Sequence, residues 1–289
     1  MAPPTSVRQS DGMGYWGPPT STLDWCETNY EVSFYIAEFW NTITNLGMII
    51  PSIYGMLHCR KLRIETRYTC SFFMLLLVGI GSWMFHMTMK FEMQLLDEIP
   101  MLWCGSYMVY CLYTSRYSCW TDGARVAGIV IASNCLAATI LYMLNKNPIF
   151  FQSMFSIMVI SGVLTSIHIN YKQYSVLGTK LSFSAVVFTF VGFLIWNIDN
   201  MYCAQVTQIR EKIFRENDVL KYFSPLTQLH GWWHFFAALA TYTQILASIQ
   251  HRLLFLNMKH SLETHWTGVF IKVNAVHANG TFKSEEHKK

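Results

Sequence analysis

Two histidines four residues apart, His230 and His234, stand at the start of a long apolar run that continues to about Leu256. Residues at this spacing share one face of a helix, one turn apart. Both imidazoles can therefore reach one metal ion, as histidine pairs do in helical zinc sites. A third candidate ligand, His86, lies near the end of another apolar run. Because ionisable side chains in hydrocarbon are costly and usually functional, we predict a membrane-embedded zinc site built from these three histidines.

Two further residues would complete a hydrolytic set. Three neutral imidazoles leave zinc an open position for water, and the ion lowers the pKa of that water to ~7. We predict that Asp97 transfers the proton as general acid and base, and that Ser82 orients the water or stabilises the oxyanion. Each residue also has a structural alternative. Asp97 is equally placed to cap a helix, with Glu98 as its solvated neighbour, and Ser82 to bond a helix carbonyl.

The composition is typical of a membrane protein. Hydrophobic residues make up 52% of the chain and charged residues 13%, whereas a soluble domain carries about 25% charged residues. The net charge of +4 is small and its basic residues are dispersed, so we expect no nucleic-acid partner. Cysteine pairs of the CxxC type are absent from the sequence, which argues against a thiolate metal site.

Seven apolar runs are long enough to span a bilayer, which takes about 17–25 residues. They lie at 33–57, 69–89, 96–115, 125–144, 149–169, 181–203 and 229–256. The first run contains Pro51, where we expect a kink. The runs are continuously apolar and lack the alternation of a barrel strand. The predicted fold is therefore all-α, a bundle of seven transmembrane helices.

Basic residues predict the orientation of this bundle. Arg8 alone precedes the first run, whereas four basic residues follow it closely. Because basic residues are enriched on the cytosolic side, we predict a lumenal N-terminus and a cytosolic C-terminus. The loop at 204–228 departs from this rule, because it places four basic residues on the lumenal side.

This topology divides the chain into three parts. We predict a lumenal segment at 1–32, a catalytic transmembrane domain at 33–256, and a cytosolic tail at 257–289 that we expect to be disordered. Counting spans then brings the ionisable residues of separate runs, Glu38 among them, to one depth on the lumenal face. Because these residues form no path across the membrane, a transporter is disfavoured.

Three sequence motifs carry a resemblance to a known family. They are SWMFH at 82–86, QLLDEIP at 94–100 and HGWWH at 230–234. These motifs resemble those of the alkaline ceramidases, which belong to a superfamily of seven-span metallohydrolases that includes the adiponectin receptors. Four more motifs look most like the type 3 members: GYWG at 14–17, STLDWCE at 21–27, AEFWN at 37–41 and WNIDN at 196–200. The resemblance covers about residues 14–256 and does not extend to the tail.

The resemblance implies an activity and a place in the cell. Alkaline ceramidases hydrolyse the amide of ceramide to a sphingoid base and a free fatty acid, at alkaline pH and with calcium stimulation, in membranes of the endoplasmic reticulum and Golgi. Type 3 members imply unsaturated long-chain ceramide, phytoceramide and dihydroceramide as substrates. The expected partners are thus ceramide and membrane lipids. A zinc ion near the membrane surface would meet the ceramide amide without extracting the lipid.

A calcium site is also implied by the resemblance. Its ligands would be Asp24, the backbone carbonyl of Trp25, Glu27, Asn29 and Glu38. The residues support the same site independently, because carboxylate and amide oxygens at this density suit a hard cation. From the residues alone, a solvated turn with one buried glutamate remains the alternative.

Other residues were predicted from their position in the topology. Cys26 and Cys203 both fall on the lumenal side, in an oxidising compartment, so we predict a disulfide between them. Asn197 and Asp199 end the sixth run near the zinc site, and Trp233 lies within the histidine motif, so each is a candidate for substrate contact. Interhelical hydrogen bonding and an interfacial tryptophan belt are the corresponding alternatives.

Two other classes of protein fit part of the pattern. A receptor of the adiponectin type would share the zinc ligands but have a cytosolic N-terminus and signal to a partner. A haem protein would use His86 and His230 as axial ligands, and would show a Soret band. The hydrolase accounts for Asp97 and Ser82 as well, and is the function we predict.

Overall fold

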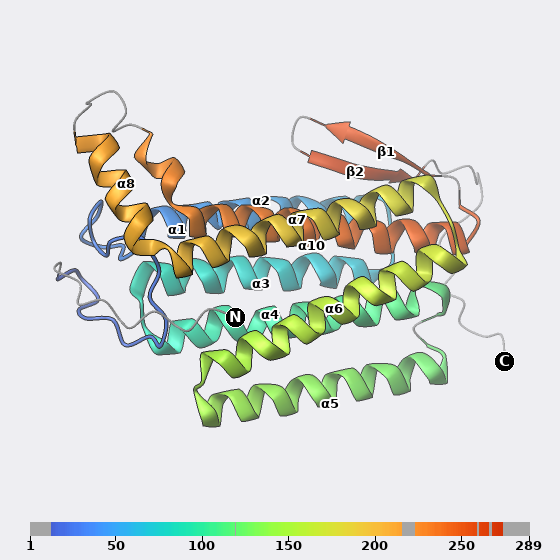
Figure 1. Cartoon of the computed structure of the whole chain (residues 1–289). Helices are drawn as coiled ribbons and strands as arrows, with labels where there is room; N and C mark the ends of the chain where they lie inside the picture. Colours follow the sequence, from blue (N-terminus) through green and yellow to red (C-terminus); the bar gives the residue numbers. More distant parts are fainter. Residues whose placement is uncertain (1–12, 119, 216–222, 259, 266–267, 274–289) are drawn as a thin grey trace.

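The described part of the chain is a bundle of helices. The computed structural model describes residues 13–118, 120–215, 223–258, 260–265 and 268–273. Among these residues, long helical segments run along a common axis in alternating directions (Figure 1). They are α2 (Leu46–Lys61), α3 (Thr66–Thr88), α4 (Phe91–Tyr113), α5 (Asp122–Asn145), α6 (Pro148–Lys172), α7 (Val176–Met201) and α10 (Leu229–Phe255). The predicted helical bundle is therefore confirmed.

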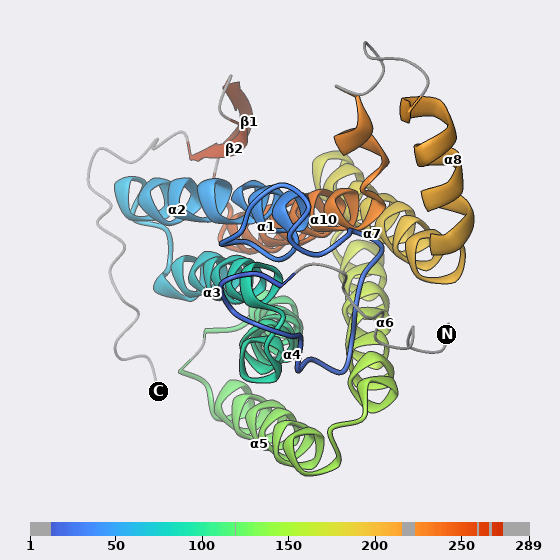
Figure 2. The ribbon, with the colours of Figure 1, turned by 90° about the vertical axis from the view of Figure 1, so that its left-hand side faces the viewer.

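Four of these helices are long and apolar enough to cross a membrane: α3, α5, α6 and α7 within the described residues. Helix α2 is shorter, at 16 residues, while α4 and α10 carry more charged and polar side chains. Figure 2 shows the bundle along its axis, with α3 between α2 and α4 and with α5 at the edge. Accordingly, 50% of the apolar window of α3 but 22% of that of α5 is buried inside the protein.

Local sequence signals start three of the outer helices. The side chains of Thr121, Asn147 and Ser175 accept backbone N–H groups in the first turns of α5, α6 and α7. Such caps satisfy donors that have no partner inside the helix. Pro148 follows Asn147 at the first position of α6, where its missing N–H costs nothing.

Helices α3 and α4 approach each other unusually closely. A methyl group on Gly81 would lie 1.9 Å from the Leu96 carbonyl oxygen, so only glycine fits there. The two helices are joined by the short turn at Met89 and Lys90, in which Met89 adopts a left-handed φ of 52°. This contact brings the residues after Gly81 and Leu96 side by side.

The first predicted span differs from its expected form. Residues 13–38 form an irregular loop, and the short helix α1 (Phe39–Thr44) precedes α2. The break falls at Asn45 and not at Pro51, which lies inside α2. Asn45 keeps helical backbone angles (φ −64°, ψ −16°) and its amide donates to the Asn41 carbonyl at 3.0 Å. The interruption is therefore local.

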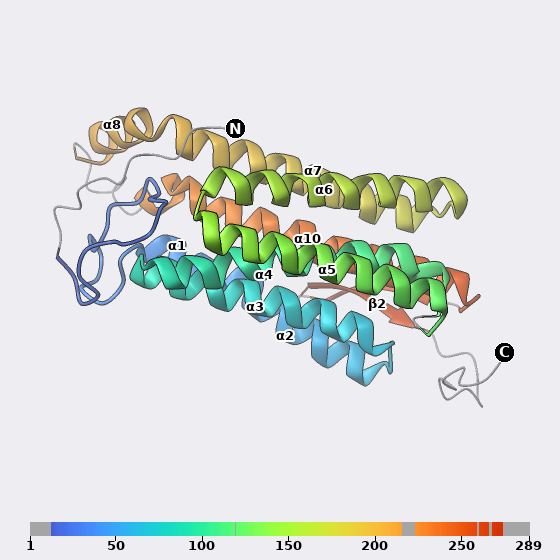
Figure 3. The same cartoon turned by 90° about the horizontal axis from the view of Figure 1, so that it is seen from below.

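The N-terminal loop folds over one end of the bundle. Its backbone donates from Thr20 to the Met89 carbonyl at 3.0 Å and from Glu38 to the His86 carbonyl at 2.9 Å. Cys26 forms the predicted disulfide with Cys203, the first residue of α8 (Cys203–Arg215), with a Cα–Cα distance of 5.3 Å. The loop, α1 and α8 lie at the same end of the bundle (Figure 3).

The tail was predicted to be disordered, and in the described residues this is wrong. Strands β1 (His260–His265) and β2 (Gly268–Val273) pair in antiparallel fashion, with His260 opposite Val273. Branched residues at alternate positions of β2, Val269, Ile271 and Val273, favour a strand. The hairpin lies toward the end of the bundle opposite the N-terminal loop (Figure 1). Residues 274–289 of the predicted tail lie outside the described residues.

Candidate active site

Three histidines from two helices meet at the end of the bundle that the N-terminal loop covers. His86 lies in the last turn of α3, and His230 and His234 lie in the first two turns of α10. One ligand atom from each ring lies within 4.8 Å of the others. The predicted triad is therefore assembled, from residues almost 150 positions apart in the sequence. Three imidazoles at this separation can hold one divalent metal ion.

Hydrogen bonds orient two of the rings. Glu38 Oε2 lies 2.5 Å from His86 Nδ1, so the carboxylate accepts Nδ1–H and leaves Nε2 as the free lone pair. The Thr44 hydroxyl donates to the Asn41 carbonyl at 3.0 Å. It is therefore an acceptor for His234 Nδ1, which lies 3.0 Å away. Outer partners of this kind fix the tautomer and direction of metal-binding histidines.

Unpartnered nitrogens support a metal site. The side chain of His86 is fully buried, yet its Nε2 has no hydrogen-bond partner among the described residues. The same holds for Nδ1 of His230. A buried polar atom without a partner costs about 1–3 kcal/mol. A cation coordinated by these nitrogens would offset that cost, so the residues fit a metal.

A tryptophan from the N-terminal loop covers the third histidine. The ring of Trp25 stacks on that of His230, with 3.8 Å between the ring centroids and 21° between the planes. The ring of Trp196, in α7, lies edge-on to that of Trp25, with 6.1 Å between the ring centroids. The disulfide of the neighbouring Cys26 holds this part of the loop in place. The loop therefore forms part of the wall of the site.

Asp97 and Ser82 lie together beside the histidines. Their side chains are joined by a hydrogen bond between α4 and α3, and the contact at Gly81 explains their proximity. The capping alternative for Asp97 is wrong, because Lys90 occupies the N-cap position of α4. Glu98 is not a solvated neighbour, since it is 3% exposed.

An apolar cavity runs from this polar cluster into the bundle. At one end it is lined by Ser82, Asp97, His230 and His234. Along α10 the lining continues from His230 to Gln244, about 20 Å at 1.5 Å per residue. Most of the remaining lining is apolar and comes from α3, α4, α6 and α7. A long apolar cavity that begins at such a cluster suits a substrate with a hydrocarbon chain.

The candidate calcium ligands also gather, in the loop beside His86. Asp24, Glu27 and Asn29 are buried, and the charges of Asp24 and Glu27 act on that of Glu38. Glu27 accepts the backbone N–H groups of Trp40 and Asn41, at 2.7 and 2.8 Å, and so caps α1. Burial raises the pKa of Glu27 to about 7, although these two N–H groups partly oppose the shift.

These oxygens fit a hard cation in part. Crowded buried carboxylates and the Asn29 Oδ1 atom, which has no hydrogen-bond partner among the described residues, are features of a calcium site. Glu38, however, already contacts His86, and Glu27 already caps α1. The structure thus gives both glutamates a second role that their sequence positions did not reveal.

The candidates for substrate contact separate into two groups. Trp233 lines the cavity, and so does Trp196, which the sequence analysis did not select. Asn197 and Asp199 are not among the residues that line it. The Asn197 amide donates to the Phe193 carbonyl of its own helix at 2.7 Å. Asp199 Oδ2 accepts the Cys26 backbone N–H at 3.3 Å, and so supports the N-terminal loop.

What the sequence did not reveal is mostly the partners of the histidines: Glu38 was predicted as a calcium ligand and not as a partner of His86, and Thr44 was not predicted at all. Glu38, Asn41 and Thr44 are spaced three apart, which places them on one helical face. A polar stripe in an otherwise apolar run was therefore a signal that could have been found. The stacking of Trp25 on His230 had no such signal, because the two residues share no periodic element.

Comparison with known proteins covers the whole of this site. The model of the family described as Ceramidase matches residues 17–277. Alkaline ceramidase 3 of Mus musculus is 40% identical over 252 residues, which cover 86% of this chain and 90% of that protein. Alkaline ceramidase YPC1 of Saccharomyces cerevisiae is 31% identical over 274 residues, 89% of this chain and 85% of that protein.

Proposed function

The chain belongs to the ceramidase family, and from that premise we propose that it is a zinc-dependent amidase of the membrane. Its substrate would be ceramide, and its products a sphingoid base and a free fatty acid. The observation that carries this proposal is the buried histidine triad, with Glu38 and Thr44 behind it and Asp97 beside it. A receptor built on the same triad is not favoured, because the matching relatives are ceramidases.

His86, His230 and His234 would hold the zinc ion. Zinc in that position would act as a Lewis acid that polarises the amide carbonyl and makes a water molecule more acidic. The protein's own contribution is orientation. Glu38 and Thr44 hold Nδ1 of His86 and of His234, so the Nε2 atoms of both rings would be the ones to bind the ion.

Asp97 is the residue that would move protons. Its carboxylate would accept a proton from the attacking water and pass it to the nitrogen of the leaving sphingoid base. The Ser82 hydroxyl is a neighbour of the Asp97 carboxylate and would donate its hydrogen to it before the reaction. Once Asp97 is protonated it is neutral, so the hydrogen bond from Ser82 becomes weaker. The Ser82 hydroxyl would then be free to turn toward the oxyanion and stabilise it.

The apolar cavity would take a hydrocarbon chain of the substrate. Its polar end lies at the histidines and its apolar walls extend along α10 for about 20 Å. A lipid bound in this way would present its amide to Asp97 while its chain stays out of water. Unsaturated long-chain ceramide, phytoceramide and dihydroceramide all share this arrangement of amide and chains.

We also propose seven transmembrane segments, with the histidine triad on the lumenal side of endoplasmic reticulum and Golgi membranes. The N-terminal loop and the hairpin lie toward opposite ends of the bundle (Figure 1), as an odd number of spans requires. Helix α8 runs across the bundle axis. The basic residues of the loop at 204–228 therefore partly belong to a helix that does not cross the membrane.

A calcium ion is proposed for the acidic loop, with Asp24, Glu27, Asn29, Glu38 and the Trp25 carbonyl as ligands. Calcium would supply positive charge to a loop whose buried carboxylates repel one another. The test is the melting temperature of the protein in detergent with and without calcium. We expect calcium to raise it, magnesium to raise it less, and Asp24→Asn to abolish the difference. An equal rise in the variant would contradict the site.

The experiment that tests the proposed function is mass spectrometry of purified protein incubated with ceramide. We expect wild type to release the sphingoid base and fatty acid, and His234→Ala to release neither and to lose bound zinc. His168→Ala is the matched control, because His168 lies on an exposed part of α6. Product release by a metal-free wild type, or undiminished release by His234→Ala, would refute the proposal.

A further inference from the structure

Glu98 is a buried carboxylate that the proposed reaction does not use. It follows Asp97 on α4, is 3% exposed and lines the same cavity. Its Oε2 atom accepts the hydroxyl of Tyr142 from α5 and, at 3.2 Å, the side-chain N–H of Gln94. Its Oε1 atom is buried and has no hydrogen-bond partner among the described residues.

The surroundings of Glu98 fix its orientation. Gln94 Oε1 accepts the backbone N–H of Thr22 at 2.8 Å, so the N-terminal loop holds the glutamine. Tyr142 is fully buried, and its hydroxyl donates to the same carboxylate oxygen as Gln94. Because two donors hold Oε2, the carboxylate cannot rotate without losing both hydrogen bonds. Oε1 therefore keeps its position, and it is left with unused acceptor capacity.

This arrangement differs from that of a structural carboxylate. A buried carboxylate is costly unless its oxygens are hydrogen-bonded. If the role of Glu98 were only to hold Tyr142 and Gln94, a neutral glutamine would hold the tyrosine at a lower desolvation cost. A carboxylate with one anchored oxygen and one unused oxygen is instead a ready acceptor for a ligand that brings its own donor.

We propose that Glu98 is a substrate-binding residue that accepts a hydrogen bond from a hydroxyl group of the sphingoid base. This inference rests on the proposed function and identifies the part of the substrate that Glu98 contacts. Neighbouring helix positions differ by about 100° around the axis. Glu98 would therefore contact substrate atoms next to those that Asp97 contacts. In a ceramide, the hydroxyl-bearing carbons of the base stand next to the amide nitrogen. The hydrocarbon chains offer no donor.

The test compares two amides that differ only in the hydroxyl groups of the base: a ceramide and the corresponding N-acyl alkylamine. A hydrogen bond to a charged acceptor corresponds to about a ten- to hundredfold preference. We expect wild type to favour the ceramide by that factor in kcat/KM. Glu98→Gln should lose most of the preference while keeping its activity toward the alkylamine. In this variant Tyr142 must donate to the amide oxygen, so an N–H₂ group replaces the free acceptor.

Two further variants separate recognition from structure. Tyr142→Phe removes the anchor but keeps the carboxylate, so activity toward both amides should fall together while a preference remains. Glu98→Asp keeps the charge but moves the free oxygen away from the substrate, so it should lower the preference for the ceramide. It replaces Glu98→Gln in the test if that variant does not fold. Equal preference in wild type and the folded Glu98 variants would overturn the inference. Failure of wild type to hydrolyse either amide would instead refute the proposed function.

Discussion

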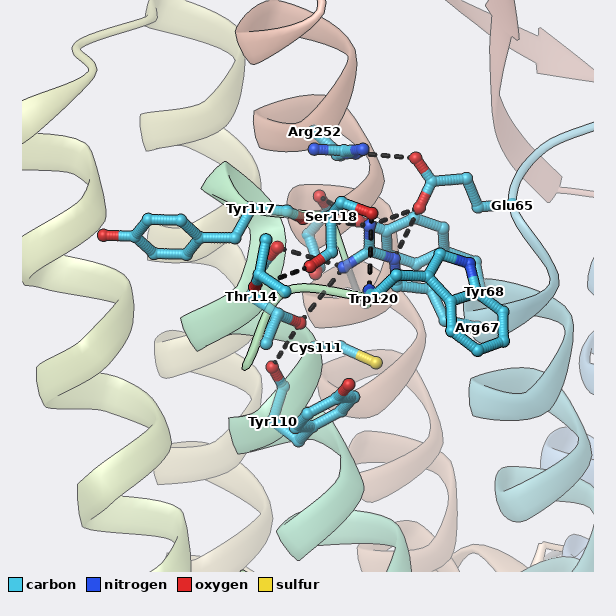
Figure 4. Close-up of polar contacts among 12 residues, drawn as sticks. Glu65, Arg67, Tyr68, Tyr110, Cys111, Thr114, Tyr117, Ser118, Trp120 and Arg252 are labelled. Atoms are coloured by element: carbon cyan, nitrogen blue, oxygen red, sulfur yellow. Dashed lines mark hydrogen bonds and ion pairs between the residues drawn. The ribbon is translucent and has the colours of Figure 1, made fainter. Parts of the chain in front are cut away.

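At the end of the bundle away from the histidines, Glu65 uses both of its carboxylate oxygens. Oε1 accepts Nε of Arg252 and Oε2 accepts Nε of Arg67, each at 2.6 Å (Figure 4). Arg67 also donates to the Thr114 carbonyl at 3.0 Å, in the 3-10 helix η1 (Thr114–Arg116). At the histidine end, by contrast, Glu38 holds His86 in place and the other ring nitrogen of His86 has no described partner.

This difference distinguishes a network that stabilises the fold from one that binds a ligand. Around Glu65, the buried guanidinium groups of Arg67 in α3 and Arg252 in α10 are held by the carboxylate, and Arg67 also by Thr114 of η1. Each oxygen of the carboxylate accepts a hydrogen bond. Around the histidines, unpartnered atoms of His86, His230 and Glu98 gather near one cavity. Buried polar atoms without a described partner also occur at the other end, in Ser115, Ser248 and His251. Such atoms are rare in proteins, and only at the histidine end do they combine with a possible metal site and a cavity among the described residues, which marks that end as the functional one.

Removing Glu65 should have the largest effect, and on stability alone. Glu65→Ala leaves Arg67 and Arg252 buried without their shared carboxylate, which costs about 3–5 kcal/mol of unfolding free energy. We expect that loss in denaturant unfolding in micelles, whereas kcat per folded molecule should stay at the wild-type value. Asp122→Ala is the control, because its pair with Arg125 lies on the surface, with side-chain exposures of 97% and 57%. A fall in kcat of folded Glu65→Ala would contradict the view that the Glu65 network only stabilises the fold.

Much of the fold could be predicted because helix spans leave a periodic or compositional signal. The apolar run predicted at 125–144 lies inside α5, at Asp122–Asn145, and the one predicted at 149–169 lies inside α6. The first span was less accurate, since residues 33–38 are apolar enough to resemble a helix but form a loop against α3. An apolar composition indicates that a segment is buried. It does not indicate whether the backbone groups of that segment form hydrogen bonds within a helix or with a neighbouring element.

The histidine triad could be predicted for a similar reason. The spacing of His230 and His234 already fixes their common face, and the alternation of spans brings His86 to the same depth. The spacing of Glu38, Asn41 and Thr44 indicates a shared polar face but not what that face contacts, because a buried carboxylate such as Glu38 is equally suited to a calcium ion and to a histidine. Only the tertiary structure shows it 2.5 Å from His86 Nδ1. Trp25 and His230 likewise meet through a loop whose path leaves no pattern in the sequence.

Changing Glu38 should have the second largest effect, on zinc rather than on the fold. Glu38→Gln replaces the charged acceptor of His86 Nδ1–H by a neutral amide, and we expect zinc affinity to fall about ten- to hundredfold. Competition with a chromophoric chelator measures this directly. Because Glu38 is also a proposed calcium ligand, Asp24→Asn is the control: it alters the acidic loop but leaves the His86 contact intact. Equal zinc affinities of Glu38→Gln and wild type would contradict this role.

Changing Thr44 should have the smallest effect, and it tests whether the second ring is held in the same way as the first. Thr44→Val keeps the shape of the side chain but removes the acceptor of His234 Nδ1–H. A single neutral hydrogen bond contributes about 1 kcal/mol, so zinc affinity should fall less than tenfold. Thr44→Ser restores the hydroxyl and should restore the affinity. If Thr44→Val and Thr44→Ser lower the zinc affinity equally, packing against His234 orients its ring and the hydrogen bond does not. The two rings would then be oriented by different means, one by charge through Glu38 and the other by shape.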